Sequence, residues 1–201
     1  MSKLHHCEIA KLRPTQISVG MIEVQDKARH LGQLGHHERR RYLADHPMPA
    51  VFGPEGKLHI TDHHHLGRAL WEAGIESGSF LVEADLSGLD PREFWVEMDR
   101  RHWVHPVDSQ GRRHGADLLP KHIKDLVDDP YRSLAGYVRN AGGFEKTPTA
   151  FAEFLWADFF RRRVRIGPKR EDFDAAVKEA LRLAHSDSAR RLPGFQPAPN
   201  V

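Results

Sequence analysis

The sequence has little cysteine, no long apolar run and almost no excess of charge. Cys7 is the single cysteine among 201 residues, which excludes an intrachain disulfide and a cysteine-based zinc site and agrees with a reducing compartment. No stretch approaches the roughly 20 apolar residues that span a bilayer. The N-terminal segment MSKLHHCEIAKLRPT also lacks the apolar core of a secretory signal. We therefore expect a cytoplasmic protein with no membrane partner.

The formal net charge of +2 is too small to indicate nucleic-acid binding by itself. Its distribution is uneven, because residues 161–170, RRRVRIGPKR, carry six basic side chains and no acid. Such a run meets phosphates in nucleic-acid-binding proteins. It is also typical of a solvated helix end, where cations complement the helix dipole. Both interpretations stay open at this point.

Two kinds of hydrophobic pattern divide the chain. Up to residue 88, short β-rich runs alternate with helical periods, which predicts an α+β fold that begins with a small mixed-sheet module. Residues 89–190 show successive amphipathic periods and predict a helical C-terminal module, including a helix over 117–128. The proline-containing segment 191–201 is expected to be a disordered tail.

The segment LHITDHHHLGRAL, residues 58–70, is the most unusual in the chain, because three consecutive histidines join a strand-like run to a helical period. We expect a strand that leads directly into a helix, with Asp62 as the N-cap and Gly74 as the C-terminal stop. The first N–H groups of a helix lack intrahelical partners and carry the positive end of its dipole. The junction therefore predicts a phosphate or other anion site.

Side chains around the junction add to this prediction. Thr61 offers a hydroxyl, and Arg68 follows His65 by three residues. Imidazoles donate to phosphate oxygens, and a neutral imidazole acts as a general base near pH 7. Consecutive helical residues point about 100° apart, so only two of the three histidines are expected to face one ligand. We assign that contact to His63 and His64.

Three other interpretations of the histidine cluster are open to comparison. Asp62 and the histidines offer metal ligands, but adjacent residues rarely close a metal site unaided, and no second cluster with ligand spacing is evident. A DHH-type phosphoesterase needs an acidic metal motif upstream of Asp62, which the sequence lacks. The third interpretation is structural, with Asp62 as a cap and the histidines on the surface of the first turn. We assign no metal ligands.

The order of these segments resembles the ParB/sulfiredoxin superfamily, and most closely its ParB-like nuclease family. The resemblance covers residues 8–165 and rests on LRPTQISVGMIEVQDK, HPMPAVFGPEGKLHITDHHHLGRALWEAG, WVHPVDSQG, DDPYRSLAGYVRNAGGFEK and FAEFLWADFFRRR. Members of the superfamily differ in function. Partition proteins bind CTP and centromeric DNA, sulfiredoxins use a cysteine, a histidine and ATP, and free-serine kinases have a DGHHR-type motif.

The resemblance implies roles for individual residues. The motif at 62–65 is closest to the kinase version, although it lacks that motif's glycine and directly following arginine, and it has no sulfiredoxin cysteine. Glu23 lies where kinase-like members keep a glutamate, which implies a Mg²⁺ partner or a proton acceptor. Lys27, one turn later, and Gln16 are then expected near the phosphate. On spacing alone, Glu23 and Lys27 equally fit a surface ion pair.

We therefore predict a ParB-like protein that binds a nucleotide (ATP, ADP or CTP, with Mg²⁺) or another phosphorylated ligand at the strand–helix junction. Phosphoryl transfer and phosphate-ester hydrolysis are the reaction classes that this site fits. One alternative is a DNA-binding or nuclease-like, partition-related protein, and another is a non-catalytic ligand sensor. The predicted catalytic residues are Glu23, Asp62, His63 and His64, and the predicted binding residues are Gln16, Lys27, Thr61, His65 and Arg68.

Overall fold

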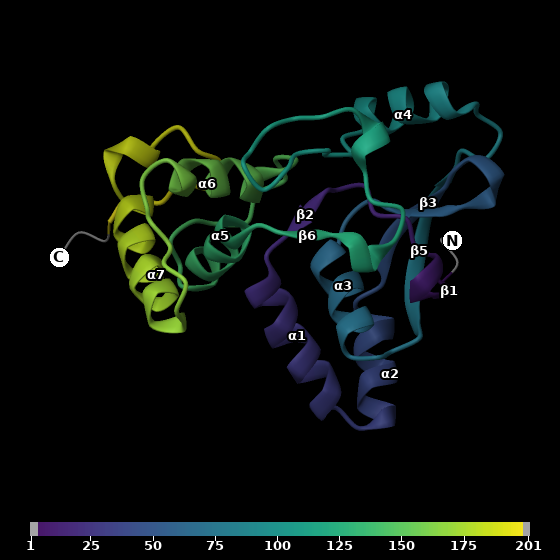
Figure 1. Ribbon diagram of the computed structural model, residues 1–201, viewed down its shortest axis with the longest axis horizontal. Helices are drawn as coiled ribbons and strands as arrows, with labels where there is room; N and C mark the ends of the chain where they lie inside the picture. The colour runs from purple at the N-terminus through teal and green to yellow at the C-terminus, as the bar shows by residue number, and fades with distance from the viewer. Residues whose placement is uncertain (1–3, 199–201) are drawn as a thin grey trace. The chain divides into compact units, whose positions relative to one another are not determined.

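The computed structural model describes residues 4–198, which divide into two compact units (Figure 1). Unit 1 extends to Asp128, and unit 2 begins at Asp129. The boundary predicted after residue 88 is therefore too early. The reason is that residues between 89 and 128 complete the cores of unit 1, where Phe94 and Ile123 are fully buried.

Unit 1 contains a four-stranded sheet with the strand order β1-β5-β3-β4. Strands β3 and β5 are parallel, whereas the other two pairs are antiparallel, so the sheet is mixed. This confirms the predicted α+β class. The elements of unit 1 are β1 (Leu4–Glu8), η1 (Ile9–Lys11), β2 (Ser18–Val19), α1 (Met21–Gln33), α2 (His36–Asp45), β3 (Met48–Phe52), η2 (Pro54–Gly56), β4 (Leu58–Ile60), α3 (His64–Glu72), β5 (Ser77–Asp85), α4 (Pro91–Arg100), η3 (Ala116–Leu118), η4 (Ile123–Asp125) and β6 (Val127–Asp128).

The sheet of unit 1 separates two hydrophobic cores, because successive side chains of a strand point to opposite faces. On one face Ala50 and Phe80 pack with Leu70 of α3 and with residues of α1. On the other face Val51 packs with Phe94 of α4. Helices α1 and α3 lie side by side on the first face (Figure 1). This pairing brings the segment before α1 against the start of α3.

The prediction of a helix over residues 117–128 is wrong. The chain there forms the short turns η3 and η4 and then strand β6, which pairs in parallel with β2. Pro120 interrupts the helical hydrogen-bond pattern. Ile123 and Leu126 are buried in the core that contains α1 and α3. The spacing of these two apolar residues therefore results from anchoring of the segment in the core and not from a continuous helix.

Unit 2 is helical, with α5 (Pro130–Asn140), α6 (Ala152–Arg161), α7 (Arg170–Ala184) and the turn η5 (Asp187–Ala189). Trp156 is fully buried, and its indole stacks on Phe144 at a centroid distance of 4.3 Å. The same indole donates to the Pro193 carbonyl at 2.8 Å, and Glu145 N–H donates to the Gly194 carbonyl at 2.8 Å. These bonds hold part of the predicted disordered tail against unit 2, and residues 199–201 lie outside the described residues.

None of the helices in the described part of the chain has the length and apolar character that crossing a bilayer requires.

His59 is a buried histidine of β4 that faces α4. Its ring packs 4.8 Å from the Phe94 ring and 5.6 Å from the Trp95 ring, measured between centroids. Burial lowers the pKa of His59 from 6.5 to about 4, the charges of Arg13 and Lys57 add to the effect, and a hydrogen bond to the Lys57 carbonyl opposes it. Because a carbonyl only accepts, Nδ1 at 3.1 Å from that oxygen carries the proton.

This depressed pKa makes stability depend on pH. Between pH 6.5 and about 4 the unfolded chain protonates His59 and the folded protein does not, so stability is lost as the pH falls through that window. Between pH 7 and pH 5, wild type should lose about 2 kcal/mol more free energy of unfolding than a His59→Gln variant, by the pKa difference. Urea unfolding of both proteins at the two pH values measures this. If the free energy of unfolding changed equally with pH in both proteins, the depressed pKa of His59 would be contradicted.

Candidate functional site

The junction between β4 and α3 is the predicted anion site, and the structure places the start of the helix there. The N-cap is His63, in a left-handed conformation with φ 62° and ψ 29°. The predicted cap, Asp62, lies one residue earlier, and its carboxylate accepts the His63 N–H at 2.7 Å. The first intrahelical hydrogen bond joins Gly67 N–H to the His63 carbonyl at 3.0 Å. The N–H groups of residues 64–66 therefore come before the first hydrogen bond of the helix.

The N-terminus of α1 lies beside that of α3. Gly20, the N-cap of α1, donates its N–H to Nε2 of His65 at 3.0 Å. The positive ends of two helix dipoles are therefore joined by a direct hydrogen bond. The exposed residues of this region, Asp62 and His63, border the same helix start.

His64 connects the start of α3 to the preceding chain. Its side chain is buried, and Nε2 accepts the Thr15 N–H at 3.0 Å. The Thr15 hydroxyl lies 3.3 Å from the same nitrogen and donates to the Ile60 carbonyl at 2.8 Å. Of the three histidines, His64 therefore stabilises the junction, and the exposed His63 is the one open to a ligand. This placement differs from the prediction, which gave both His63 and His64 a contact with the ligand.

Glu23 lies in the first turn of α1 and pairs with Lys27, with 2.5 Å between Oε1 and Nζ. Its second oxygen is 3.7 Å from Nε2 of His65. Because that nitrogen accepts the Gly20 N–H, this approach is a proximity and not a hydrogen bond. The structure thus brings Glu23, Lys27 and His65 together beside the two helix N-termini.

Two other predicted ligand groups hydrogen-bond within the protein. The Thr61 hydroxyl donates to the Glu83 carboxylate on β5 at 2.9 Å. The guanidinium of Arg68 donates to the carbonyls of Lys124 and Leu126 at 2.7 and 2.8 Å. Arg68 therefore fastens the segment before β6 to α3, which sequence spacing gave no means to foresee.

Gln16, the remaining predicted residue, is buried next to Thr15. Its backbone forms a parallel bridge with His105, whose N–H donates to the Thr15 carbonyl at 2.8 Å. The side-chain oxygen of Gln16 has no hydrogen-bond partner among the described residues. Such a buried acceptor calls for an explanation, and a bound donor or water supplies one. Sequence reasoning missed Thr15 and His105 because their contacts join distant segments.

No group of three or more histidine, cysteine, aspartate or glutamate side chains in residues 4–198 is arranged to hold a metal ion. Mg²⁺, however, is commonly held by one or two carboxylates together with waters and ligand phosphates. Glu23 is the carboxylate at this site that fits such a role.

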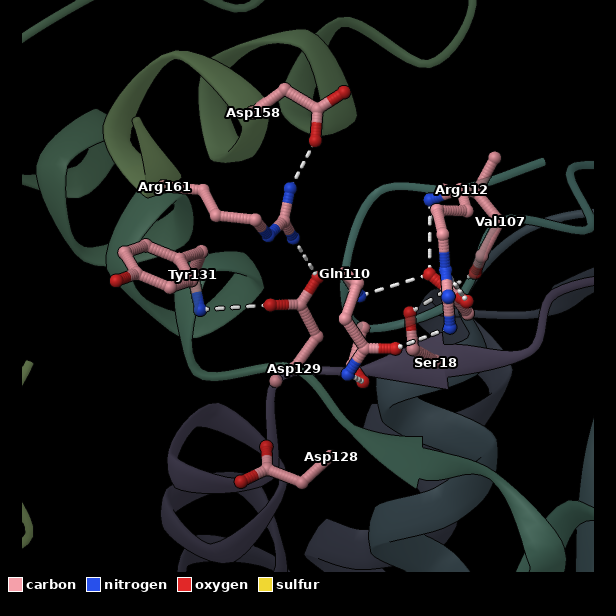
Figure 2. Close-up of polar contacts among 12 residues, drawn as sticks. Ser18, Val107, Gln110, Arg112, Asp128, Asp129, Tyr131, Asp158 and Arg161 are labelled. Carbon is pink, nitrogen blue, oxygen red and sulfur yellow. Dashed lines mark hydrogen bonds and ion pairs between the residues drawn. The ribbon is translucent and has the colours of Figure 1, made fainter. Parts of the chain in front are cut away.

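The basic run of residues 161–170 is partly used inside unit 2. Figure 2 shows Arg161 between Asp158 and the buried Asp129, with 2.5 Å to an Asp129 oxygen. The guanidinium of Arg163 donates to the Phe159 carbonyl at 3.1 Å and lies 4.1 Å from the Phe159 ring centroid. These two arginines therefore serve internal contacts, which favours the structural interpretation of this part of the run.

The chain belongs to the family described as "Putative ParB-like nuclease", whose sequence profile matches residues 5–162. It is similar to protein Atu1540 from Agrobacterium tumefaciens, which has a crystal structure. The two share 42% sequence identity over 98% of each chain, with a TM-score of 0.91. The chromosome-partitioning protein ParB from Caulobacter crescentus, solved with CTP-γ-S, aligns over 92% of this chain and 93% of its own, with 10% identity and a TM-score of 0.33. A search of curated proteins gave no match.

The different positions of the histidines predict different effects on stability. His64→Ala leaves the buried Thr15 N–H without its acceptor, so it should lower the free energy of unfolding by about 1–3 kcal/mol. His63→Asn is the matched control, because the site is exposed and asparagine tolerates a left-handed backbone. That variant should stay within about 0.5 kcal/mol of wild type in urea unfolding. Equal stabilities for the two variants would contradict the assigned role of His64.

Proposed function

We propose that the chain binds a nucleotide or another phosphorylated ligand, with phosphate held at the N-termini of α3 and α1. The observation that carries the proposal is the hydrogen bond between Gly20 N–H and His65 Nε2, which sets two helix N-termini side by side. Each N-terminus favours an anion through its dipole and its N–H groups. Asp62 and His63 border the site, and His63 supplies a donor for a phosphate oxygen.

Glu23 decides what kind of anion this site takes. A carboxylate beside phosphate is repulsive unless a cation lies between them. Lys27 supplies one positive charge, at 2.5 Å from Glu23, and Mg²⁺ held by Glu23 would supply more. The proposed ligand is therefore a nucleotide such as ATP, ADP or CTP that arrives with Mg²⁺.

The same arrangement supports phosphoryl transfer or phosphate-ester hydrolysis as the reaction class. Glu23 would accept a proton from the attacking hydroxyl or water, or orient the metal, as carboxylates do in such reactions. The family description names a nuclease, and phosphodiester hydrolysis falls within this class. His64 and His65 would act as positioning residues, because their Nε2 atoms already accept backbone N–H groups. His63 remains the proposed donor to the ligand, and Asp62 borders the same helix start.

Isothermal titration calorimetry with ATP, ADP and CTP, each with and without Mg²⁺, tests this function. We expect heat from at least one nucleotide. His63→Asn should weaken its binding by about tenfold, as loss of a charge-assisted hydrogen bond does. Glu23→Gln should reduce the dependence on Mg²⁺.

The control for these titrations is His37→Asn, because His37 is an exposed histidine on α2. This variant should bind as wild type does. A folded wild-type protein that gives no heat with any of the three nucleotides would rule the function out.

A further inference from the structure

A pocket lies in unit 1 on the face of the sheet that α4 covers. It has a volume of about 350 Å³, and Arg13, Lys57, His59, Trp95 and Lys121 are among its lining residues. Pockets that bind small molecules start at about 300 Å³. The α3 site lies at the end of β4, whereas this pocket opens beside the strand, where His59 points away from the core of α1 and α3.

The walls of this pocket are fixed by hydrogen bonds. Arg13 pairs with His59 as a parallel bridge beside β4, through Arg13 N–H to the Leu58 carbonyl at 2.9 Å and Ile60 N–H to the Arg13 carbonyl at 3.0 Å. Bridge partners point to the same face of a sheet. The Arg13 guanidinium also donates to the Lys121 carbonyl at 2.5 Å, which fixes the far wall. Main-chain pairing therefore fixes the wall at Arg13 and His59, and the Arg13 side chain fixes the wall at Lys121.

The charges that line the pocket favour an anion. Arg13, Lys57 and Lys121 are cationic, whereas Asp117 is the one acid among the lining residues. Lys57 pairs with Glu55 at 2.8 Å, but both side chains are well exposed, with 40% and 75% of their surface accessible. Exposed pairs of this kind contribute little, so a phosphate can replace Glu55 as the partner of Lys57.

The aromatic and polar groups of the pocket favour a nucleobase. Trp95 is half-buried, and its ring meets His59 edge-on at 89°, so the indole is braced from one side. Indole rings stack on any nucleobase, whatever the sequence of the strand. His59 carries its proton on Nδ1, which leaves Nε2 as an acceptor for an exocyclic amino group.

We propose that this pocket binds a base–phosphate unit, with the base on Trp95 and the phosphate among Lys57, Arg13 and Lys121. The unit is either a free nucleotide or one residue of a single-stranded nucleic acid, since both present the same chemistry. Binding here is independent of the ligand at α3.

Fluorescence polarisation with a labelled deoxyadenosine oligomer of about ten nucleotides tests the proposal, since that length fits single-strand sites. Trp95→Leu should weaken binding at least about fivefold through lost stacking. Lys57→Gln should weaken it too and reduce the slope of log affinity against log salt by about 0.7, the value for one single-strand phosphate contact. Lys57 is exposed, so this second variant keeps the test valid if Trp95→Leu fails to fold.

One control variant and a competition assign the binding. Lys178→Gln, at an exposed lysine of α7, should bind the oligomer as wild type does. Competition by AMP identifies a free nucleotide as the natural form of the ligand, whereas competition by unlabelled oligomer alone identifies a strand.

The proposal would be overturned if Lys57→Gln bound the oligomer with the affinity and salt slope of wild type. It would also be overturned if His63→Asn lost oligomer binding while Trp95→Leu kept it. Absence of any oligomer binding at low salt would also overturn it.

Discussion

The hydrogen bonds from Thr15 N–H to His64 and from Gly20 N–H to His65 determine the geometry of the junction. Adjacent residues on the first turn of α3 each accept one backbone N–H from the segment that leads into α1. A side chain that accepts a backbone donor fixes the position of the main chain itself. Together with the core packing of α1 against α3, these two bonds hold the N-terminus of α1, and Glu23 with it, beside the start of α3.

The sequence predicted the parts of the fold that depend on local patterns. The strand–helix junction and the mixed α/β character follow from residue order and periodicity. The role of His64 could not be predicted in this way, because its partner, Thr15, is distant in sequence. The helix expected over 117–128 failed for the same reason. The apolar residues of this segment are spaced so that they anchor it in the core of unit 1.

The short segment from Lys57 to His65 connects both proposed binding regions. Alternation along β4 turns Leu58 and Ile60 toward α1 and α3, whereas His59 faces α4. Where the strand ends, the left-handed backbone of His63 begins a helix and presents N–H groups. One strand thus runs beside a basic, aromatic pocket and ends at the proposed anion site.

The proposed function requires that phosphate lies at the N-terminus of α3, beside that of α1. A ¹H–¹⁵N NMR titration of the full chain with ATP and Mg²⁺ tests it most directly, because it reports on each backbone amide. We expect the largest shift changes at the amides of residues 63–66 and at Gly20. Shift changes that leave those amides unmoved, while ATP perturbs other residues or none, would contradict it.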